Sequence, residues 1–337
     1  MTRIRRSPSR PAARGLPLVA SAVLLPLLLL TGCSTDTQRA DGQISAPPHA
    51  GTPAAPPAPS PTPSGAGSPP PAASTTPHTP SATPSARSSA STSPPASPSS
   101  PAARAGRWQP RPGTAWQWQL NTRVDPSVDV PVYDIDGFEN TAADVARLHR
   151  DGRKVICYIN VGAWESFRPD SGAFPASVQG GTNGWEGERW LDIRRVDVLE
   201  PLMAKRFDMC RAKGFDAVEP DLVEGYSNDT GFPLTAAHQL TYNRMIARLA
   251  HDRGMSVGLK NDLPQIPALV GVFDFAVNEE CAEYDECDRY RPFVNARKAV
   301  FHVEYTVPNK DFCAESRRLG LSSMRKNLKL DTWRSPC

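Results

Sequence analysis

Short, strand-like runs alternate with longer helical patterns throughout residues 106–337, and this alternation limits the possible fold more than any other feature of the sequence. The short runs are rich in β-branched and aromatic residues, and the longer patterns end at Gly152, Gly214 and Gly254. A glycine just beyond a periodic segment is a common signal for the end of a helix. Strands are expected at residues 116–120, 130–136, 155–160, 216–221, 255–261, 275–279, 299–305 and 321–327.

Strands that alternate with helices predict an α/β protein with a parallel sheet. The segment has roughly 230 residues, close to the about 250 that a (β/α)8 TIM-like barrel typically uses. An open doubly wound sheet is the alternative, but no GxGxxG motif or phosphate-binding loop supports its nucleotide-binding version. We therefore expect residues 106–337 to form one (β/α)8 barrel domain. The connection between residues 120 and 130 shows no helical pattern and is the weakest part of this count.

Residues 1–105 differ in composition and are not expected to belong to the barrel. An arginine-rich start precedes an apolar run that ends in LTGC, which resembles a bacterial lipobox. Residues 1–32 therefore have the pattern of a lipoprotein signal peptide with a lipid on Cys33, and an ordinary signal peptide is the alternative. Residues 33–105 are rich in Pro, Ser, Thr and Ala. Because such a segment buries too little apolar surface to fold, we expect a disordered tether.

These features predict where the protein acts and what it meets. The chain is expected at the extracellular face of the bacterial cell membrane, lipid-anchored through Cys33, or secreted. Its net charge of +3 is small and no basic stripe occurs, so nucleic acid is not expected as a partner. The membrane is expected as a partner only through the lipid anchor, and the protein is expected to be a monomer.

Cysteine spacing supports export into an oxidising compartment. Removing Cys33 leaves six cysteines, and an even number is typical of disulfides in exported proteins. Cys157 lies on the expected outward face of its strand, toward the helix that contains Cys210, while Cys281 and Cys287 flank a short loop. Elimination gives the third pair, so the expected disulfides are Cys157–Cys210, Cys281–Cys287 and Cys313–Cys337. No CxxC, HxH or HExxH spacing occurs, so neither a metal nor another cofactor is expected.

Side-chain alternation places polar residues together near the C-terminal ends of several expected strands. Asp134 and Asp136 share one face, Glu219 and Asp221 share another, and Lys260 ends a polar face of its own strand. The opposite faces are apolar enough to pack against helices. Because (β/α)8 barrels carry their active sites at this mouth, we expect the polar faces to point inward. The same rule groups Gln117 with Gln119, Tyr158 with Asn160, Glu280 with Asn278, and His302 with Glu304.

Several long motifs occur in order within residues 108–337: WQWQL, YDIDGF, CYINVGAWESFRPD, GWEGERWLDIR, GFDAVEPDLVEGY, GLKNDL and FDFAVNEECAEYDECD. Together they resemble glycoside hydrolase family 114, the endo-α-1,4-polygalactosaminidases. The resemblance implies a (β/α)8-like barrel that cleaves α-1,4-linked galactosamine or N-acetylgalactosamine polymers internally, with two carboxylates and no metal. The alternative is a surface lipoprotein that binds an amino-sugar polysaccharide without cutting it.

The motifs of the family also imply the catalytic residues. The Asp of EPD is Asp221, expected as the nucleophile, and the Glu of VNEEC is Glu279, expected as the acid and base of a two-carboxylate mechanism. Alternation favours Glu280 in place of Glu279, and we follow the resemblance. The sequence has EPDLVEGY where the family pattern has EPDNVDGY. Leu222 and Glu224 are therefore expected to affect the rate or the subsite preference, and Glu224 is expected on a solvated loop.

The insertion after the third expected strand is rich in aromatic and glycine residues, which suits the binding of a polysaccharide over the barrel mouth. Trp164, Trp185 and Trp190 lie in it, and a pair between Asp192 and Arg194 is expected to pin it.

Further polar and aromatic residues near the expected mouth are candidates for binding substrate, although packing is an equally good interpretation for the tyrosines. Lys260 can lower the pKa of a neighbouring carboxyl group, or simply pair with Glu219. The candidates are Asp134, Asp136, Tyr158, Glu219, Tyr226, Lys260, Asn261, Tyr305 and Trp185.

Overall fold

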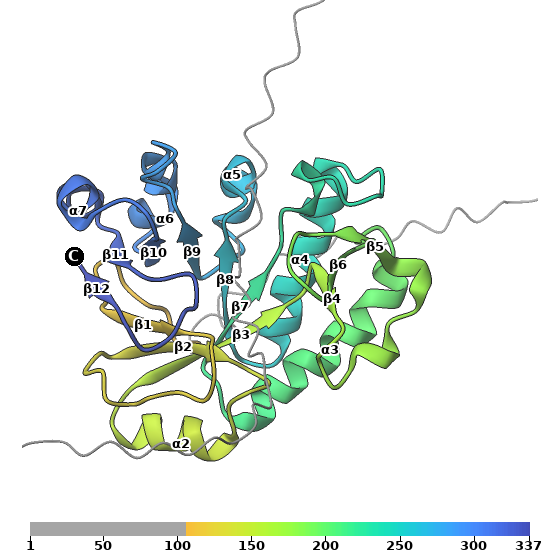
Figure 1. Ribbon diagram of the computed structural model, residues 1–337, viewed down its shortest axis with the longest axis horizontal. Coiled ribbons are helices and arrows are strands. Elements are labelled where there is room, and N and C mark those ends of the chain that lie inside the picture. Colours follow the sequence, from red (N-terminus) through yellow and green to blue (C-terminus); the bar gives the residue numbers. More distant parts are fainter. Residues whose placement is uncertain (1–105) are drawn as a thin grey trace, which may run out of the picture. The chain divides into compact units, whose positions relative to one another are not determined.

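In the computed structural model of the chain, the structure describes residues 106–337. These residues form a mixed α/β fold around a curled nine-stranded sheet of order β1-β2-β3-β7-β8-β9-β10-β11-β12 (Figure 1). The expected signal peptide, the lipid on Cys33 and the expected tether lie outside the described residues. Within the described range, no helix is long and apolar enough to cross a membrane.

The first eight strands of this order are parallel, and they match the eight runs expected from the sequence. β12 (Ser335–Pro336) pairs antiparallel with β11 at the edge of the sheet. The parallel strands are β1 (Trp116–Gln119), β2 (Val132–Asp136), β3 (Lys154–Asn160), β7 (Ala217–Asp221), β8 (Ser256–Lys260), β9 (Phe275–Glu279), β10 (Val300–Glu304) and β11 (Ser322–Arg325).

The edges of the parallel sheet meet through side chains and a loop. No strand ladder joins β11 to β1 in the described part of the chain. Instead, Trp116 Nε1 donates a hydrogen bond to the carbonyl of Ser322 at 2.8 Å, and the backbone N–H of Leu120 donates to the carbonyl of Leu330 at 3.0 Å. The sheet thus has the eight parallel strands of the expected barrel, but residues 326–334, called the closing loop below, fill the last gap.

Helices follow most of the parallel strands, and threonine residues cap two of them. Thr141 caps α2 through a capping box with Asp144, and Thr235 caps α4 in the same way. The connection from β1 to β2 has no helix, in agreement with the missing pattern there. The helices are α2 (Ala142–Arg150), α3 (Val196–Lys213), α4 (Ala236–Asp252), α5 (Ile266–Leu269), α6 (Arg291–Asn295) and α7 (Asn309–Leu319), with 3-10 turns at Ser171–Ala173, Ala176–Val178, Gly225–Ser227, Leu263–Gln265 and Cys287–Tyr290.

The insertion between β3 and α3 is a small sheet of its own. Its antiparallel order is β4-β6-β5, and Glu165 lies directly opposite Glu188. Arg206 joins the insertion to α3, because its guanidinium group forms ion pairs with Asp170 at 2.8 Å and with Glu165 at 3.2 Å. The strands are β4 (Ala163–Glu165), β5 (Gln179–Thr182) and β6 (Glu188–Leu191).

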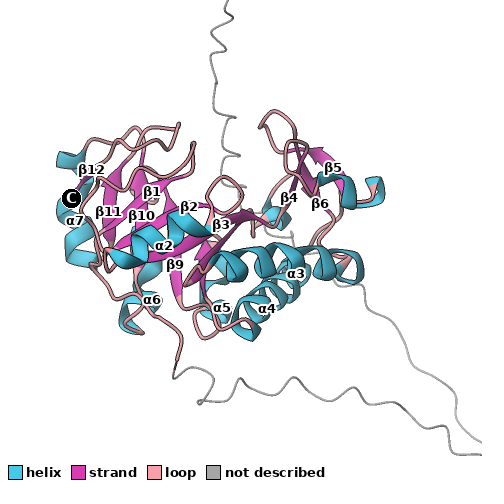
Figure 2. Ribbon diagram, turned by 90° about the horizontal axis from the view of Figure 1, so that it is seen from below, coloured by secondary structure: helices cyan, strands magenta, loops and turns pink. Residues whose placement is uncertain are grey.

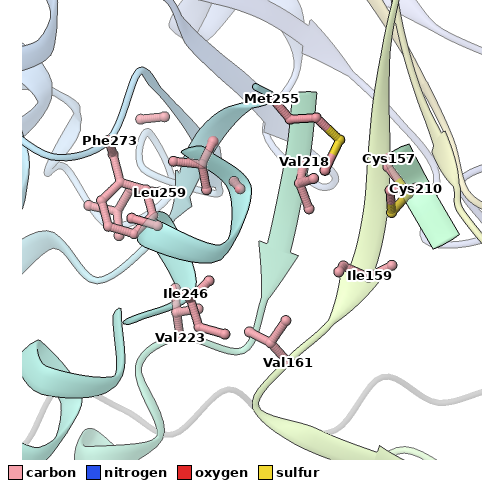
Figure 3. Close-up of a cluster of buried hydrophobic side chains, with 14 of the residues drawn as sticks. Cys157, Ile159, Val161, Cys210, Val218, Val223, Ile246, Met255, Leu259 and Phe273 are labelled. Atoms are coloured by element: carbon pink, nitrogen blue, oxygen red, sulfur yellow. A yellow bond between two sulfur atoms is a disulfide. The ribbon is translucent and has the colours of Figure 1, made fainter. Parts of the chain in front are cut away.

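The outer face of the main sheet packs against the helices in one apolar layer. α3 and α4 lie side by side there (Figure 2), and Figure 3 shows Val218 of β7 beside Met255, and Ile246 of α4 beside Val223. In the same layer Cys157 of β3 is bonded to Cys210 of α3 (Figure 3). The structure also contains the disulfides Cys281–Cys287 and Cys313–Cys337, so the three pairs are those expected from the sequence.

The inner face of the sheet holds a second, largely aromatic cluster on the N-terminal side of the polar residues. Phe275 and Phe301 meet edge to face with ring centroids 5.7 Å apart. A Cβ atom at Gly258 would lie 2.4 Å from the ring of Phe275, so glycine is what leaves room for this layer. The strand residues of the cluster are Trp116, Trp118, Val132, Ile156, Ala217, Phe275, Val277, Phe301, Val303 and Met324.

This aromatic layer shows that the predicted facing of three strands was wrong. On β1 and β10 the tryptophans, Phe301 and Val303 point inward. The polar residues expected there face the other way: His302 contacts Ser323 at 2.8 Å and the ring of Phe312 in α7. On β9 the inward residues are Phe275, Val277 and Glu279, so the prediction that Glu280 faces inward was wrong. An apolar strand face therefore predicts packing against the helices only where the inner face of the sheet has no aromatic layer of its own.

Candidate active site

One buried ammonium group joins the C-terminal ends of three neighbouring strands. Lys260 Nζ, at the end of β8, lies 3.2 Å from Glu219 Oε1, 3.0 Å from Asp221 Oδ1 and 3.1 Å from Glu279 Oε2. It also lies 4.8 Å from the ring centroid of Trp118. Because β7, β8 and β9 are adjacent and parallel, their ends meet at one edge and bring these side chains together.

Asp221 is held as a carboxylate. Its Oδ1 faces Lys260, and its Oδ2 accepts a 2.7 Å hydrogen bond from the hydroxyl of Tyr158 on β3. Burial opposes ionisation here, but the charge of Lys260 and the two hydrogen bonds outweigh it, so the pKa of Asp221 lies below its ordinary value. An ionised carboxylate at a barrel mouth is suited to act as a nucleophile.

Glu279 faces Asp221 across the same ammonium group. The hydroxyl of Tyr305 donates a hydrogen bond to Glu279 Oε1, and the side-chain oxygen of Asn261 accepts from the Glu279 backbone N–H at 3.1 Å. Since Lys260 Nζ lies 3.0 Å from Asp221 Oδ1 and 3.1 Å from Glu279 Oε2, the two carboxyl groups lie on either side of one ammonium group, close enough to act on one glycosidic bond.

The turn after Asp221 is unusually tight. Leu222 has a φ of 58°, in the left-handed region that Asn tolerates better than Leu. A Cβ atom at Gly162 would lie 1.8 Å from the carbonyl oxygen of Leu222, and the backbone N–H groups of Val161 and Gly162 donate to the carbonyl of Asp221 at 3.1 and 3.2 Å. The turn therefore fixes the Asp221 backbone, and Leu222 occupies a position that suits the asparagine of the family pattern.

Glu224 belongs to the site, and its expected place on a solvated loop was wrong. It lines the cleft and accepts hydrogen bonds from Asn261 Nδ2 at 3.3 Å and from the backbone N–H of Asp262 at 3.0 Å. Burial raises the pKa of Glu224 despite these bonds. Side-chain alternation could not predict that Glu224 lies in the cleft, because the chain turns back beneath the mouth after Leu222.

Asp134 and Glu219 form a buried carboxyl pair beneath Asp221. Neither carboxyl oxygen of Asp134 meets a nitrogen or hydroxyl donor among residues 106–337, and its neighbour is the carboxyl group of Glu219. Two carboxyl groups can hydrogen-bond only if one carries a proton. Burial, and then the charge of Glu219, raises the pKa of Asp134 far above its ordinary value, so Asp134 holds that proton. Trp118 Nε1 donates to Glu219 at 3.0 Å from the other side.

Asp136 anchors the insertion to the main sheet. Its two oxygens accept hydrogen bonds from the guanidinium group of Arg168 at 3.1 and 2.7 Å, and Arg168 also bonds to Glu165 of β4 at 2.9 Å. The Asp136 carboxylate is therefore satisfied by protein groups, although the residue also lines the cleft.

The structure brings most, but not all, of the other candidate binding residues to the cleft. Trp185 and Trp190 line it, whereas Trp164 donates through Nε1 to the carbonyl of Ser171. Tyr226 lies outside the lining, with its pKa raised to about 12 by burial and by Asp262. The expected pair between Asp192 and Arg194 is present at 2.7 Å. The candidates that line the cleft are Asp136, Tyr158, Asp221, Lys260, Asn261, Glu279, Tyr305 and Trp185.

These residues surround an open cleft of about 780 Å³. Its walls are the strand ends, the small inserted sheet and the closing loop, which contributes Leu328, Lys329 and Leu330. No local pattern in the sequence indicates that the closing loop, Phe167 or Glu188 reaches the mouth. Acidic side chains dominate: Asp136, Glu139, Glu165, Glu188, Asp221, Glu224, Asp229 and Glu279 against Arg168, Lys260 and Lys329.

One group of possible metal ligands occurs in the described part of the chain, at Cys281, Cys287 and His302. The two sulfur atoms are joined in a disulfide, so they offer no thiolates. This cluster does not fit a metal centre.

A curled parallel sheet with two carboxylates facing each other at its C-terminal mouth is the arrangement of a glycoside hydrolase. The model of glycoside-hydrolase family GH114 matches residues 97–337, and the chain belongs to this family.

Solved structures agree with this assignment. Ega3 of Aspergillus fumigatus, crystallised in complex with galactosamine, is 40% identical with a TM-score of 0.66, over 69% of this chain and 98% of that one. The glycoside hydrolase domain of PelA from Pseudomonas aeruginosa shares the fold, with 14% identity and a TM-score of 0.51 over 65% of this chain and 97% of that domain.

Among sequence relatives, an uncharacterized protein of Deinococcus radiodurans is 29% identical over 203 residues, which span 53% of this chain and 64% of that protein.

Proposed function

We propose that this glycoside hydrolase cleaves α-1,4-linked galactosamine or N-acetylgalactosamine polymers internally, without a metal. The observation that carries the proposal is the contact of Lys260 with both Asp221 and Glu279, which brings two carboxyl groups close together, as a two-carboxylate reaction needs. The family membership, the acidic cleft and the 40% identity to Ega3, which was crystallised with galactosamine, support an amino-sugar substrate.

We propose a double displacement with retention, in which two carboxyl groups that share one ammonium group act on the same glycosidic bond. The Asp221 carboxylate attacks the anomeric carbon while the Glu279 carboxyl group gives its proton to the glycosidic oxygen, so the carbon–oxygen bond breaks and a glycosyl ester forms. Glu279 then takes a proton from water, which attacks the same carbon and releases Asp221. Tyr158 and Lys260 hold Asp221 ionised for the first step, and Tyr305 orients Glu279.

A reducing-end assay on partly deacetylated polygalactosamine tests the activity. The wild type should release oligosaccharides, and Asp221→Asn should abolish turnover while the protein still folds at the assay temperature. Simultaneous loss of folding would mark Asp221 as structural. Proton NMR of the first products reports the anomer, and an inverted product would contradict the proposed double displacement.

A binding protein without activity is the second candidate, favoured by the left-handed Leu222 beside Asp221. In that case the wild type would bind the polymer and release nothing.

For the location of the protein, we propose a lipid anchor at Cys33 on the extracellular face of the cell membrane, because of the LTGC motif. Radiolabelled lipid incorporation into wild type but not Cys33→Ser tests this.

A further inference from the structure

The carboxylates of the cleft differ in whether the protein supplies a positive partner. Asp136 and Glu165 pair with Arg168, while Asp221 and Glu279 pair with Lys260. Glu188 lines the same cleft, yet no ion pair to it occurs in the described residues 106–337; its partners are amide groups. A largely buried carboxylate without a cation is costly, so the place of Glu188 calls for a function.

The position of Glu188 adds to this cost. It begins β6 and lies directly opposite Glu165 of β4 in the antiparallel ladder, so the two side chains share one face of the inserted sheet. Like charges at directly opposite positions are destabilising. Arg168 and Arg206 both pair with Glu165 and neutralise its charge. The charge of Glu188, the other carboxylate on this face, is therefore not neutralised by an arginine among residues 106–337.

The same position brings Glu188 next to the nucleophile. Asn183 Nδ2 and Asn160 Nδ2 donate to Glu188 Oε2 at 2.7 and 3.4 Å. Asn160 is the last residue of β3, and its register partner on β7 is Asp221. Both hydrogen bonds use one oxygen, so the carboxylate is oriented by protein while its charge remains open to a ligand in the cleft.

We propose that Glu188 binds the ammonium group of a 2-amino sugar seated beside Asp221, and that it thereby selects the free amine over the N-acetylated or hydroxyl form. An ammonium group offers both a positive charge and three N–H donors, whereas an acetamide is neutral and bulkier. This inference rests on the proposed function and names a residue that neither the sequence motifs nor the resemblance assigned.

The electrostatics of the site support this assignment. Burial, followed by repulsion from Glu165 and Asp221, raises the pKa of Glu188 to about 7, while Asn183 and Arg168 act in the opposite direction. An ammonium ligand stabilises the charged form and lowers this pKa again. Binding at neutral pH should therefore release a proton, and affinity for the amine should rise as the pH increases toward 7.

The test compares wild type, Glu188→Gln and the matched control Glu186→Gln, which changes an exposed glutamate two residues away that does not line the cleft. Calorimetry with galactosamine, N-acetylgalactosamine and galactose, in two buffers of different ionisation enthalpy, gives affinities and protons released. The ratio of kcat/KM on deacetylated and acetylated polymer gives the preference during turnover.

We expect Glu188→Gln to lose about tenfold to a hundredfold of the preference for galactosamine, and to lose the proton release, because a charge-assisted contact becomes neutral. Glu186→Gln should retain both. The assignment is wrong if Glu188→Gln keeps the preference and the proton release, and in that case hydrolysis by the wild type still upholds the proposed function. If the wild type hydrolyses no polymer, the proposed function fails, and the galactosamine titration alone decides the role of Glu188.

Discussion

Lys260 is the residue whose removal should disturb the site most. Replacing it with methionine keeps a long unbranched side chain but removes the ammonium group that contacts Glu219, Asp221 and Glu279. Removing one member of a buried ion pair costs about 3–5 kcal/mol, because the remaining charge stays uncompensated. Lys260 has three carboxyl partners within 3.2 Å, so we expect a loss at the upper end of this range at neutral pH.

The loss should depend on pH in a defined direction. Asp221, whose pKa is lowered below 3.8, contributes stability that is present above that value and is lost as the pH falls through its folded-state pKa. Lys260, whose pKa is raised above 10.5, stays charged throughout the acidic and neutral range. Without Lys260 the pKa of Asp221 rises. The difference in unfolding free energy between Lys260→Met and the wild type should therefore shrink as acid protonates the carboxyl groups.

Urea unfolding at about pH 7.5 and about pH 3 measures this difference, because the lower pH lies below 3.8, where the wild type begins to lose the contribution of Asp221. Lys205→Met, a change at an exposed position of α3, serves as the control and should alter stability little at either pH. Turnover of the polymer should fall together with stability in Lys260→Met, because Asp221 and Glu279, the two carboxyl groups of the proposed mechanism, lose their common partner. An equal loss at both pH values, or no loss at all, would refute the idea that Lys260 compensates the buried charges.

Two further substitutions test the surroundings of Asp221 and Glu279. Asp134→Asn should change the free energy of unfolding by less than about 1 kcal/mol in urea, because the carboxamide can donate to Glu219 as the protonated carboxyl group does. A loss of several kcal/mol would mean that Asp134 is ionised. Gly162→Ala places a methyl group 1.8 Å from the Leu222 carbonyl and should cost about 1–3 kcal/mol or more by thermal unfolding, with a fall in kcat as Asp221 shifts. Gly172→Ala, with no atom within 4 Å of its new Cβ, should change neither quantity.

Local patterns were sufficient to predict the strands, most helices and the polar ends of β2, β3, β7 and β8. Periodicity and terminal glycines are local properties, and Asp221 and Lys260 face inward as alternation requires. The facing of β1, β9 and β10 could not be predicted by the same rule. Their interior side chains are aromatic, and a run such as Phe275 and Val277 suits either an aromatic interior or a helix-covered exterior.

Other parts of the site depend on contacts that no local pattern contains. Glu188 reaches the mouth only because the insertion folds into a sheet whose register sets it opposite Glu165. The left-handed turn at Leu222 returns Glu224 to the cleft. The family resemblance selected Glu279 over Glu280 because it compares whole motifs, and so did not depend on assigning an inward face.

The closing loop has a consequence for how the cleft forms during folding. A backbone hydrogen bond joins Leu120 to Leu330, although some two hundred residues of chain separate them. The wall of the cleft that contains Leu328 and Leu330 exists only after this contact is made. Contacts of such long sequence separation form late, because the entropy of closing the intervening chain must be overcome first. A nascent chain can assemble β7, β8 and β9 with their charged residues before synthesis reaches the closing loop. The chain gains a complete substrate groove only in the final stage of folding. Enzymatic activity therefore appears only in molecules that have finished folding.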